Sequence, residues 1–184
     1  VCSDVSKSCP NDCNSKGACI YKDNRATILP NCSITNSLCK ATCECNSGFY
    51  GKDCSLTESK LNVLTEFRDS LCFNLYASLS LQDVNTEMMS ARALTVADIF
   101  VDMTQVSERA FSLCTQVLVE TIRAHPTLAC EGKSGEKIAT ALSNVLSRSS
   151  ISSIVLSNIS DVVSLVASDC QQNIAVGEVP LLFN

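Results

Sequence analysis

The chain has 184 residues, of which 13 are cysteine, with one histidine, no tryptophan and a formal net charge of −5. This mild negative charge, without a run of lysine or arginine, argues against nucleic acid and anionic membranes as partners. The cysteine content predicts disulfides and an oxidising, extracellular compartment, and the length suffices for a small module followed by a helical domain of about 120 residues.

Closely spaced cysteines mark residues 9–54. The segment begins with Cys-Pro-Asn-Asp-Cys and ends with Cys-Glu-Cys, which is followed after eight residues by a last cysteine. The six cysteines of this set are Cys9, Cys13, Cys19, Cys43, Cys45 and Cys54. Gly48 and Gly51 allow the backbone angles of a tight hairpin, and Phe49 can cover a bridge across it. A zinc site of the Cys-x-Cys kind is the alternative, but the turn glycines favour disulfides and the histidine lies far along the chain.

This pattern resembles an EGF-like module of the tenascin or teneurin type. The resemblance covers roughly the first third of the chain, and it implies the bridges Cys9–Cys19, Cys13–Cys43 and Cys45–Cys54. The chain departs from the family in the length of residues 20–42. We interpret this segment as an inserted loop that a fourth bridge, Cys32–Cys39, pins in place.

The residues before Cys9 indicate whether the module has a calcium-binding motif. Calcium-binding members of the family carry an Asp-x-Asp/Glu step just before the first cysteine, whereas this chain has Ser6-Lys7-Ser8 there and an isolated Asp4. We therefore expect no calcium site, and no other metal or cofactor.

Cys2 makes the number of cysteines odd. Its distance from Cys9 is about that between neighbouring modules in tandem EGF-like arrays, so residues 1–8 are interpreted as the end of a preceding module or a linker. A bridge from Cys2 to another chain or to the helical region is the alternative. Because the chain starts at Val1 without a leader, we expect it to be processed or excised from something longer.

Two Asn-x-Ser sequons predict N-glycans at Asn31 and Asn158. Asn31 lies on the disulfide-pinned inserted loop and is the better acceptor. Asn158 lies within a helical pattern, so its occupancy depends on whether it faces solvent.

Residues 55–174 have helical apolar spacing, which predicts an all-α, disulfide-braced bundle of about five helices. The first helix is expected to start at a capping box of Ser55 and Glu58 and to end near Leu81. Its core-facing stripe would be Leu61, Leu64, Leu71, Leu75 and Leu79.

Four further helices are expected after a turn at residues 82–85. The second should end near Met103, and the third should be capped by Thr104 and stopped at His125-Pro126. The fourth and fifth carry apolar stripes over 138–146 and 151–166, the fifth with Ile151, Ile154, Val155, Ile159, Val162, Val163 and Val166.

The four cysteines of this region allow three connectivities. Short connections make neighbouring helices antiparallel, which brings Cys130 and Cys170 to one end of the bundle. Cys72 and Cys114 lie on inward faces of the first and third helices. We therefore predict the bridges Cys72–Cys114 and Cys130–Cys170.

Residues 175–184 leave the helical pattern and form an extended tail. The tail ends while still apolar, which suggests a missing next element or docking on a neighbour, with Val179, Leu181, Leu182 and Phe183 as interface candidates. A Ser/Leu/Val-rich helical region that ends in a Gly-Glu-x-Pro step resembles the helical part of GAIN and receptor-for-egg-jelly type ectodomains, which polycystin-like and large protist surface proteins carry. The autoproteolysis motif of that family needs a tryptophan, which this chain lacks.

Enzymatic chemistry finds little support in the sequence. His125 precedes a proline at a helix end, which favours a helix-terminal role near the negative end of the dipole. Asp98 and Asp102 stand one helical turn apart and are interpreted as a solvated face. No apolar stretch reaches the roughly 20 residues that a membrane-spanning helix needs.

These observations predict a non-enzymatic structural or assembly segment of a large modular extracellular glycoprotein. We expect it in a fibre or matrix, a role that EGF-like modules also have in mastigonemes, with copies of itself or neighbouring modules as partners. The alternative is a ligand-binding adhesion or receptor ectodomain that precedes a membrane-proximal GAIN-like domain.

Overall fold

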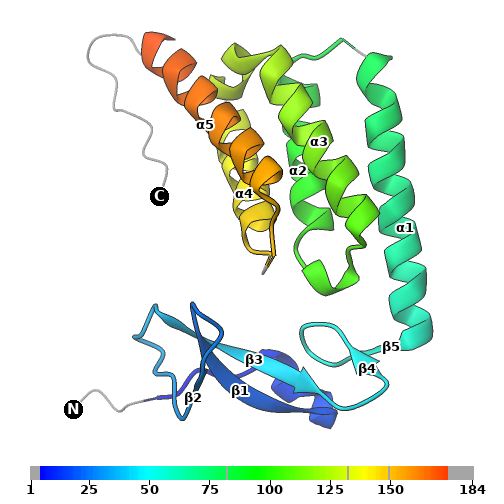
Figure 1. The fold of residues 1–184 in the computed structure, drawn as a ribbon, viewed down its shortest axis with the longest axis vertical. Coiled ribbons are helices and arrows are strands. Elements are labelled where there is room, and N and C mark those ends of the chain that lie inside the picture. Colours follow the sequence, from blue (N-terminus) through cyan, green and yellow to red (C-terminus); the bar gives the residue numbers. More distant parts are fainter. Residues whose placement is uncertain (1–4, 82, 132, 149, 174–184) are drawn as a thin grey trace. The chain divides into compact units, whose positions relative to one another are not determined.

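A computed structural model describes residues 5–81, 83–131, 133–148 and 150–173. Most of the chain is helical (Figure 1), and it divides into two compact units, Val1–Thr65 and Glu66–Asn184. The boundary falls within helix α1 (Glu58–Ala77), not at Ser55, where the amino-acid composition changes.

A three-stranded antiparallel sheet forms the centre of the first unit. Strand β1 (Gly17–Asp23) pairs along its whole length with β3 (Cys39–Cys45), and β2 (Ile28–Leu29) pairs with the other edge of β1. Both ends of the segment 20–42 therefore belong to the sheet, together with the two residues of β2. The predicted inserted loop corresponds to the connections between these strands, and the longer one, residues 30–38, contains Cys32, which is bonded to Cys39.

A left-handed turn precedes the sheet. In η1 (Pro10–Ser15), the backbone φ angles of Asn11 to Ser15 are all positive, from 46° to 55°. L-residues adopt this region at a cost of order 1–2 kcal/mol each, and asparagine and aspartate tolerate it best. The disulfide of Cys9, just before the turn, and that of Cys13, within it, hold this backbone in place.

Four disulfides staple the first unit, and they join the pairs expected from the sequence. They are Cys9–Cys19, Cys13–Cys43, Cys32–Cys39 and Cys45–Cys54. Gly48 and Gly51 have φ angles of 84° and 88°, as the tight turn requires. Phe49 packs against the buried sulfur cluster.

The first helix starts later than predicted. Strand β5 (Leu56–Thr57) pairs with β4 (Phe49–Tyr50), so the two residues after Ser55 are extended and α1 begins at Glu58. The backbone N–H of Ser55 donates to Asp53. The capping box with Ser55 as N-cap is therefore wrong, because strand pairing takes the residues that it would start.

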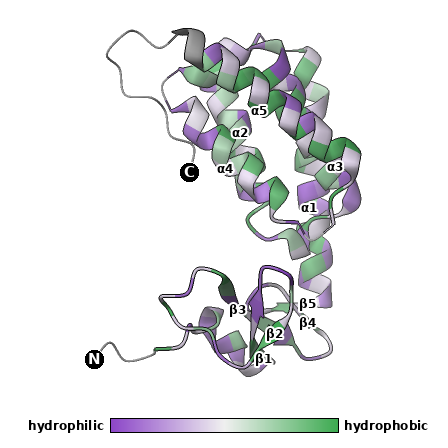
Figure 2. Cartoon of the chain, turned by 60° about the vertical axis from the view of Figure 1, so that its left-hand side comes forward, coloured by the Kyte–Doolittle hydropathy of each residue, from purple (hydrophilic) through white to green (hydrophobic). Residues whose placement is uncertain are grey.

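The second unit is a bundle in which α2 to α5 share one core. Its helices after α1 are η2 (Ser78–Ser80), α2 (Thr86–Ile99), η3 (Met103–Gln105), α3 (Glu108–Ala124), η4 (Pro126–Cys130), α4 (Ser134–Leu146) and α5 (Ser153–Asn173). Figure 2 shows how apolar residues recur along these helices. The largest buried side chains are those of Met89, Val96, Phe100, Val117, Leu118, Ile122, Val145 and Val162.

Polar caps set the starts of α2 and α3. The side chain of Asn85 accepts a hydrogen bond from the Met88 N–H, and that of Ser107 accepts one from Ala110 N–H. Thr104, predicted as the third cap, lies in η3 and donates to Asp102. The second helix also ends at Ile99, before Met103, so that the chain can make η3 between the two helices.

Helix α1 buries little of its surface. Among its residues only Cys72 is fully buried, where it forms the bridge to Cys114 of α3. Leu71 and Leu75 pack partly against the core, whereas Leu61, Leu64 and Leu79 remain half-exposed. The predicted stripe therefore overstates how much of this helix is buried. The position of α1 against the bundle depends on the Cys72–Cys114 disulfide.

The last helix meets the core on a narrower stripe than predicted. Ile159, Val162 and Val166 are buried, but Ile154 and Val163 are exposed. Cys170 is bonded to Cys130 of η4, so the ends of these two segments meet as expected. The chain after Asn173, including the predicted tail, lies outside the described residues.

Removing the Cys72–Cys114 bridge tests the role of the disulfide that holds α1. Changing both cysteines to alanine should lower the free energy of unfolding by about 3–4 kcal/mol, because the bridge closes a loop with a sequence separation of 42. Urea unfolding measures this loss. The matched control is the double change at Cys130 and Cys170, with a separation of 40. Only the first variant should lose hydrogen-exchange protection in α1; equal protection in both would contradict the assignment.

Asp53 makes the first unit sensitive to acid. Hydrogen bonds from Ser55, and next from Asn11, lower the pKa of Asp53 to about 2 from an ordinary value of 3.8. A carboxylate with a lowered pKa contributes stability above pH 4, and the contribution disappears as the pH falls toward 2. Asp53→Asn should therefore flatten the change in the unfolding midpoint between pH 4 and pH 2, by a modest amount because the group is solvated. An unchanged pH dependence would contradict this role.

Candidate functional site

The residues considered for catalysis do not converge in the structure. His125 is the C-cap of α3, and Asp98 is exposed on α2. Asp102 is buried and caps η3, where it accepts hydrogen bonds from Thr104 and Gln105. The prediction that Asp102 lies on a solvated face is therefore wrong, because the carboxylate is buried where it caps η3.

Sulfur atoms of the first unit lie close enough together to resemble a metal site. Those of Cys9, Cys13 and Cys43 are within 4.8 Å of one another. Each of them is in a disulfide, and a disulfide sulfur is not the thiolate that zinc binds. The cluster therefore serves as a cystine core.

An apolar groove lies between α4 and α5 of the second unit. It has a volume of about 350 Å³ and is lined mainly by Ile138, Leu142, Leu146, Val163, Val166 and Ala167. Leu146 and Val163 at its edges are 47 % and 48 % exposed. Exposed apolar surface that forms a continuous groove is typical of a binding surface. Sequence reasoning assigned Val163 to the core, although adjacent apolar positions such as Val162 and Val163 point in different directions on a helix.

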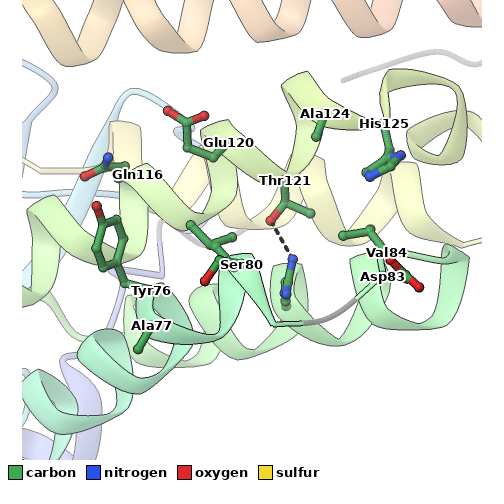
Figure 3. A pocket seen from close by; sticks show the side chains of 12 residues that line it. Tyr76, Ala77, Ser80, Asp83, Val84, Gln116, Glu120, Thr121, Ala124 and His125 are labelled. Atoms are coloured by element: carbon green, nitrogen blue, oxygen red, sulfur yellow. Dashed lines mark hydrogen bonds between the residues drawn. The ribbon is translucent and has the colours of Figure 1, made fainter.

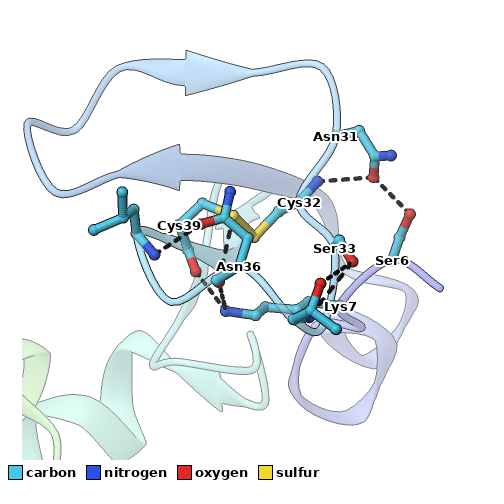
Figure 4. Close-up of a disulfide and its surroundings, with 9 residues drawn as sticks. Ser6, Lys7, Asn31, Cys32, Ser33, Asn36 and Cys39 are labelled. Carbon is cyan, nitrogen blue, oxygen red and sulfur yellow. Dashed lines mark hydrogen bonds between the residues drawn. A yellow bond between two sulfur atoms is a disulfide. The ribbon is translucent and has the colours of Figure 1, made fainter. Parts of the chain in front are cut away.

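The first unit also exposes apolar side chains, around the loop between β2 and β3. Here Cys32–Cys39 closes a loop against which the N-terminal segment lies (Figure 4), with Lys7 Nζ donating to the backbone oxygens of Asn36 and Cys39 at 2.7 Å. Around this loop the exposed residues include Val5, Ile28, Ile34 and Leu38. Tyr21 is half-buried, because it lies in the central strand between Leu29 and Ala41.

The two sequons have different surroundings. Asn31 is exposed, and its side-chain oxygen accepts hydrogen bonds from Ser6 Oγ and Cys32 N–H. In Figure 4 its amide nitrogen, to which a glycan would be attached, points away from these partners. Asn158 is half-buried and accepts a hydrogen bond from Arg123 at 2.9 Å. The geometry therefore favours Asn31 as the acceptor.

Contrary to the expectation from the sequence, helix α5 is long and apolar enough over Ser153–Cys170 to cross a membrane by length and composition. It also contributes Ile159, Val162 and Val166 to the core and is bonded through Cys170 to η4. These contacts are those of a helix in a bundle. Cys2 and the interface candidates Val179, Leu181, Leu182 and Phe183 lie outside the described residues.

No protein-family model, curated protein or solved structure matches this chain. The disulfides indicate an oxidising environment on their own. The functional interpretation must therefore rest on the arrangement of the residues.

Proposed function

We propose that this chain is a non-enzymatic structural segment of a large modular extracellular glycoprotein, in which it helps to assemble a fibre or matrix. In this proposal an EGF-like module is followed by a disulfide-braced helical bundle, and both present rigid surfaces to neighbouring copies. The chain would be glycosylated and secreted or displayed at the cell surface.

The observation that carries the proposal is that disulfides brace both units. Twelve cysteines among the described residues form six bridges, and two of these lie in the helical unit. Such cross-links form and persist mainly in oxidising compartments. They also resist unfolding and proteolysis where the apolar core is small, which suits a load-bearing extracellular part.

The strand and bridge pattern supports the EGF-like interpretation of the first unit. Cys19 and Cys43 are direct partners in the β1–β3 ladder. Cys19 is bonded to Cys9, just before the left-handed turn, and Cys43 is bonded to Cys13, within it. The Cys45–Cys54 bridge then joins the end of β3 to the connection between β4 and β5. This pairing is the one that the family resemblance implies.

The groove between α4 and α5 is the proposed assembly surface, and its occupant is the segment Val179–Phe183 of a neighbouring copy. The segment reads Val-Pro-Leu-Leu-Phe and carries no charge, which matches a groove lined by aliphatic side chains. Pro180 favours an extended backbone, and an extended peptide can place successive side chains in such a groove.

Electron microscopy of native, non-reduced material purified without detergent tests the proposed function. We expect regular filaments or sheets that contain this chain in the repeating unit. Dispersed single particles at every concentration would contradict assembly and would favour the receptor-ectodomain alternative.

Leu146→Asp tests the proposed groove. The change places a charge at the edge of the apolar surface and should weaken self-association by about tenfold or more, as measured by analytical ultracentrifugation. Phe183→Asp should do the same from the other side of the contact.

The matched control is Ile154→Asp, since Ile154 is exposed on α5 and does not line the groove. Its self-association should equal that of the unaltered chain. Equal effects of Leu146→Asp and Ile154→Asp would overturn the assignment. So would a loss of stability without a change in association, which would indicate that the segment occupies the groove of its own chain.

A further inference from the structure

A polar cavity in the helical unit lies apart from the groove between α4 and α5. It has a volume of about 640 Å³ and lies between the end of α1, the start of α2 and α3. Figure 3 shows Tyr76 and Gln116 toward one end and His125 toward the other. Its polar lining includes Tyr76, Ser80, Asp83, Arg92, Glu120 and His125.

Arg92 is the unusual member of this lining, because its charge is buried. The residue is only 3 % exposed. Its guanidinium donates to Thr121 Oγ1 (the dashed line in Figure 3) and to the Ser78 backbone oxygen, both at 3.3 Å. These two bonds leave most of its five N–H donors unused, and Nε is buried without a partner.

No carboxylate lies within ion-pair distance of Arg92 in the part of the chain that the structure describes. Burial lowers the pKa of Arg92, but a guanidinium remains charged at neutral pH. A buried charge without a counter-ion is costly, and an aliphatic side chain of similar length would avoid that cost. The arrangement therefore suits an anionic group supplied from outside the chain.

The other charged groups of the cavity limit which anion fits. Asp83 and Glu120 line the same cavity and are exposed. Their negative charges disfavour ligands with several negative charges and attract a cationic group. A deep cation combined with outer carboxylates matches a ligand that carries a carboxylate at one end and an ammonium at the other.

We propose that the cavity around Arg92 binds a small amino acid, whose carboxylate accepts hydrogen bonds from Arg92 and whose ammonium group faces Glu120. The Tyr76 hydroxyl and the Gln116 amide supply further polar contacts along the wall. This site is independent of the proposed assembly role.

Titration calorimetry on the intact, oxidised chain tests the site with three probes: glycine, 4-aminobutanoate and acetate. The two amino acids differ in the spacing between their charges. We expect at least one of them to bind saturably, and more tightly than acetate. No saturable binding of either amino acid, or equal affinity for acetate, would overturn the proposal.

Substitutions in the cavity test the contacts of the ligand's carboxylate and of its ammonium group separately. Arg92→Met should weaken the binding of the amino acid by about tenfold or more, because it removes a charge-assisted hydrogen bond. Arg92→Lys retains the charge but not the planar fork, so it should weaken binding less, and it replaces Arg92→Met should that variant not fold. Binding that neither substitution weakens would overturn the proposal.

Glu120→Gln should weaken the binding of the amino acid about two- to fivefold, the range of an exposed charge pair, and leave acetate binding unchanged or tighter. The matched control is Glu87→Gln, since Glu87 is exposed on α2 and does not line the cavity. If Glu120→Gln tightens the binding of both kinds of probe, the site is a simple anion site and the amino-acid assignment is wrong.

Discussion

Covalent cross-links between cysteines are the constraint on which the rest of the structure depends. In the first unit they hold a turn of five successive residues with positive φ, a conformation that costs free energy even where the residue is asparagine or aspartate. In the second unit they hold α1, which has a single fully buried residue, and that residue is the bridged Cys72. Both segments would lack sufficient packing to stay in place without these bonds, because an isolated helix or turn is marginal in water.

The pattern of apolar and cysteine residues predicts much of this fold, since both signals are local. The EGF-like resemblance implies three bridges of the first unit, the spacing of Cys32 and Cys39 indicates the fourth, and the antiparallel order of short-linked helices indicates Cys130–Cys170. The helix starts were less predictable. Ser55 and Thr104 have the side chains of N-caps, but strand pairing at Leu56–Thr57 delays the start of α1, and Ser107 caps α3 after η3, which contains Thr104. Tertiary contacts of this kind produce no repeating pattern of residues from which they could be predicted.

Function was harder to predict because its surfaces depend on which faces remain uncovered. The apolar stripes of α4 and α5 predict core packing, yet Leu146 and Val163 stay half-exposed and border a groove. Arg92 gives no signal at all in the sequence, where it is one basic residue in a helical stretch. Only the packing of α2 against Thr121 and the end of α1 shows that its charge is buried beside a cavity.

The most direct test of the cross-linked arrangement is a disulfide map of the native chain, made by mass spectrometry of peptides from unreduced protein with free thiols blocked beforehand. We predict the six pairs Cys9–Cys19, Cys13–Cys43, Cys32–Cys39, Cys45–Cys54, Cys72–Cys114 and Cys130–Cys170. Free thiols at these positions, bound zinc, or different partners for Cys72 and Cys114 would contradict the account of how both units are held together.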